Sequence, residues 1–170
     1  MDMEKLFSQV DRLAGGRQAT YVIADEMRDH PRTARAFNAI LWLLVLEFLI
    51  GIAAVVVALA IAAGGDRVPW AVWMRTVVVL GMTVTLFYFT WRARLGFYWG
   101  YSRLRLFSKI FPVVTLVLAA IPGLYPLWMV TEQIIFSLIL IGVADYLDSD
   151  HMRAAFPRPA RRAASEDQRG

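Results

Sequence analysis

The stretch FNAILWLLVLEFLIGIAAVVVALAIAA, residues 37–63, decides the fold, because Glu47 is its one charged side chain. About 20 helical residues are enough to cross a hydrocarbon core ~30 Å thick. The apolar side chains occupy every side of such a helix, where a helix on a soluble core would show a single stripe. Lipid on all sides requires this pattern, so the stretch predicts a transmembrane helix.

Three further apolar stretches repeat this pattern, and we predict spans at about 37–63, 69–91, 103–121 and 124–146. Together they predict an all-α, integral membrane bundle of four transmembrane helices over residues 37–147. The third span is the weakest, because its purely apolar part covers only residues 110–121. To cross fully it must include Arg103, Arg105 and Lys109, whose long side chains would snorkel to the interface. A partial, re-entrant third segment stays open.

The composition restricts the chemistry of the chain. Hydrophobic residues make up 58% of the 170 residues and charged residues 19%, against about 45–50% and about 25% in soluble domains. No cysteine is present, which excludes disulfides and thiolate-bound metals. His30 and His151 both flank the apolar runs, so a haem held by two histidines inside the bilayer is not expected. We expect no cofactor and no metal.

The two ends are polar. Residues 1–36 read as a cytoplasmic, amphipathic segment and not as a signal peptide. A first short helix is predicted before Gly15-Gly16, and a second from Gln18 to about Asp29. Residues 148–170 are rich in Arg, Ala and Pro and are predicted to be a disordered cytoplasmic tail.

The loops indicate the orientation. Residues 92–109 contain five basic side chains and no acid, interleaved with aromatic residues, whereas loops 64–68 and 121–124 share a single arginine. Because basic loops stay in the cytoplasm, both termini are predicted to be cytoplasmic. The excess of Arg over Lys favours a bacterial origin, hence the inner membrane. We interpret residues 92–109 as an interfacial segment in contact with anionic lipid and not with nucleic acid, through four arginines: Arg92, Arg94, Arg103 and Arg105.

Four charged residues interrupt the spans: Glu47, Arg75, Lys109 and Glu132. Charges at this depth are costly and usually have partners in the bundle interior. At ~1.5 Å per residue, Glu47 lies roughly 15 Å and Lys109 about 12 Å from the cytoplasmic side. Arg75 and Glu132 lie roughly 9 and 12 Å from the outer side. The matching depths predict two ion pairs, Glu47 with Lys109 and Arg75 with Glu132.

Small residues share a helix face with Glu47, namely Gly51, Ala54, Ala58 and Ala62, and would let another helix approach closely. Gly81 and Thr85 form a similar pair in the second span. Asp145, Asp148 and Asp150 cluster near His151, where solvated helix-end acids are favoured over a loose cation site.

No catalytic motif is present, so three functions remain open. The first is a non-catalytic accessory or scaffold subunit, in contact with a larger membrane protein or with further copies of itself. The alternative is a small ion- or proton-linked channel or transporter that uses Glu47 and Glu132. The third is a lipid-handling enzyme that holds head groups with its basic segment.

Overall fold

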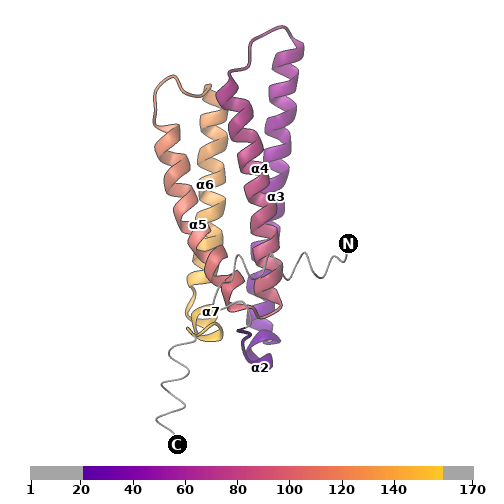
Figure 1. The fold of residues 1–170 in the computed structure, drawn as a ribbon, viewed down its shortest axis with the longest axis vertical. Helices are drawn as coiled ribbons and strands as arrows, with labels where there is room; N and C mark the ends of the chain where they lie inside the picture. Colours follow the sequence, from indigo (N-terminus) through magenta and orange to yellow (C-terminus); the bar gives the residue numbers. More distant parts are fainter. Residues whose placement is uncertain (1–20, 159–170) are drawn as a thin grey trace, which may run out of the picture.

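The computed structural model describes residues 21–158. Its long helices are α3 (Pro31–Ala63), α4 (Trp70–Arg94), α5 (Tyr98–Ala119) and α6 (Leu127–Asp148), and they run side by side (Figure 1). Two short helices, α2 (Asp25–Arg28) and α7 (Asp150–Ala155), lie at the lower end in that view. The described part contains no strand and only a single bridge, between Val22 and Phe97. The all-α prediction therefore holds for residues 21–158.

Three of these helices, α3, α4 and α6, are long and apolar enough to cross a membrane. Helix α5 is as long as α6, with 22 residues each, but it contains three basic side chains in its first twelve residues. The chain therefore has the helices of a membrane protein, with three candidate membrane-spanning segments in the described part.

The long helices lie close to the predicted spans but differ at their ends. Helix α3 begins at Pro31, six residues before the predicted span, because proline suits the first turn of a helix. The ring nitrogen Nδ1 of His30 accepts a hydrogen bond from the Arg32 amide at 3.1 Å and caps this turn. Helix α6 begins later than predicted, at Leu127, directly after Pro126.

Two glycines allow the helices to pack closely. A Cβ atom at Gly51 in α3 would lie 2.9 Å from a methyl group of Leu80 in α4. A Cβ atom at Gly100 in α5 would lie 2.8 Å from the backbone nitrogen of Ala93 and 3.0 Å from the Phe89 carbonyl oxygen. Of the small-residue face that the sequence places next to Glu47, Gly51, Ala54 and Ala58 are buried inside the bundle, whereas Ala62 is exposed near the end of α3.

The segment before α2 is extended over residues 21–23. The Ile23 amide donates to the Gly96 carbonyl at 3.0 Å, and the Tyr98 amide donates to the Tyr21 carbonyl at 3.2 Å. Gly96 has a φ of +92°, which favours glycine. A helix was expected from Gln18 to about Asp29, but among the described residues only α2 is helical. The residues before α2 are extended instead, because their backbone pairs with the loop at Gly96. The helix expected before Gly15 lies outside the described residues.

Part of the segment expected to be disordered is folded. Residues 150–155 of the predicted tail form α7, and Met152, Ala155 and Phe156 are buried. These residues follow a spacing of three and one, so they share one apolar face on a short helix. The Phe156 ring packs edge-on against Phe37 of α3. Residues 159–170 lie outside the described part.

Candidate functional site

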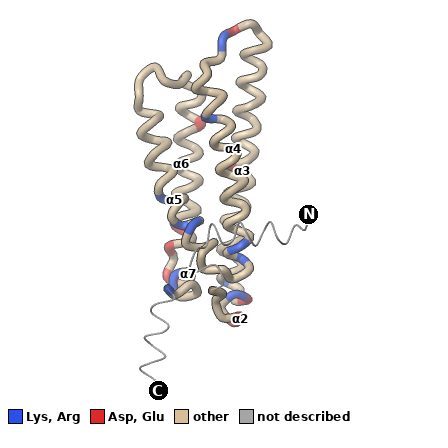
Figure 2. The backbone as a smooth tube through the Cα atoms, viewed as in Figure 1, with Lys and Arg blue, Asp and Glu red and all other residues tan. Residues whose placement is uncertain are grey.

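Charged side chains are sparse in the middle of the bundle. Lys and Arg gather at the lower end, and a further charged pair, Asp66 and Arg67, lies in the upper loop (Figure 2). Three charged side chains are buried between these levels: Glu47, Arg75 and Glu132, which are 2%, 9% and 8% exposed. We therefore take this interior polar group as the candidate functional site.

Arg75 and Glu132 form an ion pair between α4 and α6. Arg75 Nη1 lies 2.5 Å from Glu132 Oε2. Figure 2 shows the basic and acidic positions adjacent in the upper half of the bundle. The depth estimate from the sequence predicts this contact, and it is present. A buried pair of this kind fixes the register of the two helices that it joins.

The predicted pairing of Glu47 with Lys109 is wrong. Glu47 Oε1 accepts a hydrogen bond from the Thr83 hydroxyl at 2.9 Å, which joins α3 to α4. Lys109 Nζ instead forms an ion pair with Asp148 at the end of α6. Side chains on a helix lean toward its N-terminus, and the N-terminus of α5 lies at the basic end. The lysine therefore reaches away from the depth of its own Cα atom, which the depth estimate did not include.

A third polar contact joins α5 to α6. The hydroxyls of Thr115 and Ser137 lie 2.8 Å apart, and Ser137 also donates to the Gln133 carbonyl at 2.8 Å. The side-chain amide of Gln133 is buried next to this contact and has no hydrogen-bond partner among residues 21–158. Glu47 Oε2 is likewise buried without such a partner in that part of the chain.

The sequence analysis did not identify Thr83 and Thr115 as partners. A threonine in an apolar helix usually bonds to the carbonyl four residues earlier, as Thr76 and Thr90 do. Only the fold shows which threonines also contact another helix. The sequence offers just a weak signal, a hydroxyl on the same face as a small residue or a charge.

The four arginines predicted to contact lipid have different surroundings. Arg92 lies among aromatic rings, with its guanidinium carbon 4.8 Å from the centre of Trp91 and 5.2 Å from that of Phe97. Arg105 forms an ion pair with Asp148 through Nε. Arg94 and Arg103 are exposed. Arg92 and Arg105 thus have different partners, aromatic rings for one and a carboxylate for the other.

The acidic cluster at the end of α6, Asp145, Asp148 and Asp150, does not form a metal site in the described residues, where no group of three or more potential ligands converges. Asp148 is engaged by Arg105 and Lys109. Asp150 lies 3.9 Å from Arg153.

The two histidines meet at the lower end, a contact that the sequence did not predict. The rings of His30 and His151 lie 4.7 Å apart between their centres. The Thr33 hydroxyl donates its proton to the Met27 carbonyl at 2.9 Å. The same hydroxyl oxygen lies 2.9 Å from His151 Nε2, so it is placed to accept a hydrogen bond from the N–H of that ring. Burial, followed by the nearby His30 and Arg32, lowers the pKa of His151 from its usual value of 6.5.

Comparison with known proteins gives no relative for this arrangement, since no family model, no curated protein and no solved structure matches the chain.

Proposed function

We propose that this chain is a non-catalytic accessory or scaffold subunit of a bacterial inner-membrane complex. In this proposal α3, α4, α5 and α6 all span the bilayer, and both termini are cytoplasmic. Two observations support the topology: α5 runs alongside the other long helices (Figure 1), and basic residues gather at the end where the termini-flanking helices α2 and α7 lie (Figure 2). Basic residues favour the cytoplasmic side of a membrane.

The interior polar residues support a structural role over a reactive one. Each of the three contacts joins two different helices: Glu47 with Thr83, Arg75 with Glu132, and Thr115 with Ser137. Interhelical hydrogen bonds and ion pairs of this kind hold a membrane bundle together in a single register. The polar side chains are therefore used to assemble the bundle itself.

The observation that carries the accessory role is the outward face of α4. A Cβ atom at Gly81 would meet nothing within 4 Å, and Val77 and Val84, one turn to either side, are exposed. The Thr85 hydroxyl is bonded to the Gly81 carbonyl at 2.8 Å, so it adds no free polar group. A small residue between larger ones creates a shallow notch that favours close helix packing in lipid. We propose that a transmembrane helix of a larger protein occupies it.

Affinity purification of the tagged chain in mild detergent, followed by mass spectrometry, tests this role. We expect a larger membrane protein in stoichiometric amount with the natural chain. The Gly81→Leu variant should lose that partner, because leucine fills the notch. Ala53→Leu on the exposed side of α3 is the matched control and should retain it. The proposal would be contradicted if Gly81→Leu retains the partner or if the natural chain purifies alone. If the natural chain purifies as a homo-oligomer that Gly81→Leu disrupts, the partner is a second copy of this chain.

A second candidate function is a small proton- or ion-linked channel or transporter. Its support is the pair of buried, unpartnered polar groups, Glu47 Oε2 and the Gln133 amide, within the part of the chain that the structure describes. Intramembrane acids often belong to proton or ion paths. In proteoliposomes, Glu47→Gln should abolish flux while protein abundance and melting temperature stay at the natural level. A parallel loss of abundance would indicate a folding role for Glu47 instead.

A further inference from the structure

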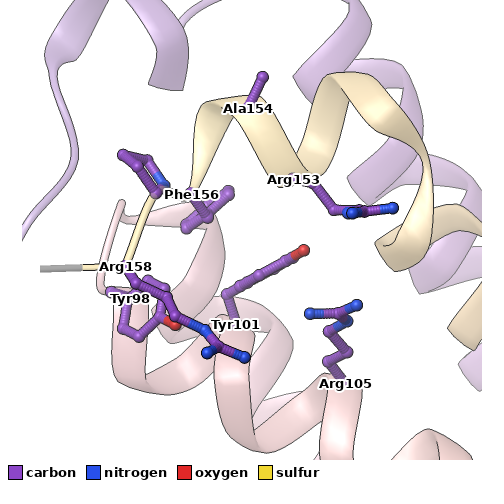
Figure 3. A pocket seen from close by; sticks show the side chains of 8 residues that line it. Tyr98, Tyr101, Arg105, Arg153, Ala154, Phe156 and Arg158 are labelled. Atoms are coloured by element: carbon purple, nitrogen blue, oxygen red, sulfur yellow. The ribbon is translucent and has the colours of Figure 1, made fainter. Parts of the chain in front are cut away.

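A pocket of about 470 Å³ lies at the basic end of the bundle. Tyr98, Tyr101 and Arg105 of α5 line one side, and the segment from Arg153 to Arg158 closes the other (Figure 3). This volume falls within the range of small-molecule sites, about 300–1,000 Å³. The pocket is separate from the interior polar contacts and from the outward face of α4.

The floor of the pocket is built from two stacked rings, one of which is hydrogen-bonded to α6. The rings of Tyr101 and Phe156 stack with their centres 4.4 Å apart and an angle of 12° between their planes. The Tyr101 hydroxyl donates to the Leu147 carbonyl at 2.7 Å, which ties the floor to α6. Both rings are almost fully buried. Because the floor is ordered already, a ligand would lose little affinity in ordering it.

The charged groups around the pocket favour an anion. Three arginines line it, and no acidic residue does. In Figure 3 the Arg105 guanidinium lies below the Tyr101 hydroxyl, and the Arg153 side chain extends from α7 to the right of it. Arg105 is held by Asp148, which it shares with Lys109, and Arg153 lies 3.9 Å from Asp150. Arg158 forms no ion pair with any acid of residues 21–158. The basic side chains at the pocket therefore outnumber the carboxylates that they contact, which leaves a net positive charge there.

We propose that this pocket binds a phosphate ester, supplied by the head group of an anionic phospholipid. Guanidinium groups match phosphate oxygens in a bidentate geometry, which makes arginine the preferred residue for phosphate recognition. The tyrosines are typical of the level in a bilayer where head groups meet the hydrocarbon core. Helix α6, a candidate spanning helix, ends at Asp148 beside the pocket, so lipid phosphates would lie at this height.

The test measures lipid binding by the full-length chain. The protein is purified in a neutral detergent and titrated with phosphatidylglycerol, and bound lipid is counted by native mass spectrometry. The Arg153→Gln/Arg158→Gln double variant should bind at least about tenfold more weakly, since each charge-assisted hydrogen bond to the phosphate contributes more than one decade of affinity. Both side chains are exposed, so the fold should persist, as melting temperature would verify.

The matched control is Arg35→Gln/Arg67→Gln, which removes two exposed arginines outside the pocket and should leave the affinity unchanged. Equal weakening in both double variants, or none in the pocket variant, would overturn the proposal. Phosphatidylcholine, whose head group has no net charge, and soluble glycerol phosphate are the remaining arms. Glycerol phosphate that binds as tightly as the lipid, and depends on the same two arginines, would keep the phosphate site and reassign its source to a soluble phosphate ester.

Discussion

At the residue scale, substitutions can measure how strongly Arg75 and Glu132 stabilise the bundle as a pair. Arg75→Met would leave Glu132 buried without its counter-charge and should destabilise the bundle by about 3–5 kcal/mol. The double variant Arg75→Met/Glu132→Leu should recover most of that loss, because an apolar pair needs no counter-charge in this environment. Thermal unfolding in detergent of the two single variants and the double variant measures the coupling. Additive losses would show that the two side chains act independently.

Two glycines on the long helices offer a matched comparison. Gly100→Ala should destabilise the chain by about 1–3 kcal/mol, because its methyl group would collide with the backbone of α4 and neither side can move aside easily. Gly81→Ala should be neutral or slightly stabilising, since the added methyl group meets nothing within 4 Å and alanine favours a helix. Melting temperatures of both variants check this. A larger loss for Gly81→Ala than for Gly100→Ala would contradict the packing described here.

The residue-scale contacts could be predicted from the sequence only where depth decides them. Arg75 and Glu132 have similar estimated depths, roughly 9 and 12 Å from the outer side, and their side chains meet, so the estimate finds this pair. The partner predicted for Lys109 was wrong because this long, flexible side chain reaches about a turn or more from its own Cα atom, to Asp148. The hydroxyl partners, such as Thr83, depend on which helices are neighbours, and helix order is not contained in a hydropathy pattern.

At the element scale, the docking of α7 on the start of α3 should depend on pH. The pKa of His151 is lower in the folded chain than its usual value of 6.5, so the docked state favours the neutral ring. The contribution of this contact is therefore complete above pH 6.5 and is lost as the pH falls through that value, because the undocked ring takes up a proton more readily. Protonation of His151 also places a positive charge next to the His30 ring, whose centre lies 4.7 Å away, and near Arg32.

Distances between spin labels would show the release of α7. Labels on Cys introduced at the exposed positions Arg35 and Ala154 should give one narrow distance at neutral pH and a broad distribution in acid. The same labels in a His30→Gln/His151→Gln background should give a distribution that does not change with pH. A narrow distance in acid with both histidines present would mean that α7 stays docked whatever the charge of His151.

The elements themselves were predicted unevenly. The four long helices lie close to the predicted spans, but α3 begins earlier, at Pro31, and α6 begins later, after Pro126. Helix α5 begins at Tyr98, five residues before the predicted third span. Helix α7 was missed because six residues form a stable helix only when packed, here through Phe156 onto Phe37. The extended segment at Tyr21 was missed because its partner, the Gly96 loop, is distant in the sequence.

At the scale of the whole molecule, the separation of charge is the property that both the sequence and the structure express. Basic side chains in the loop between α4 and α5, at the start of α3 and around α7 come together at one end of the bundle (Figure 2). The opposite end has only the short turns around Asp66 and Gly123. Such an asymmetry predicts the orientation of a membrane protein more reliably than it predicts any individual contact.

The proposed topology predicts which loops face each side of the membrane. Because the chain has no native cysteine, each loop can be tested with a single introduced Cys. Single Cys variants at Asp66 and Pro122, in the two short turns, should react with a membrane-impermeant maleimide on intact cells. Cys at Arg94 and Ala154 should react only after the membrane is opened. Pro122 is the decisive position, because it follows α5, whose three basic residues make its crossing the least certain by composition. Labelling of Asp66→Cys from outside together with protection of Pro122→Cys would make α5 re-entrant and reduce the number of spans, since α5 would then return to the side from which it entered.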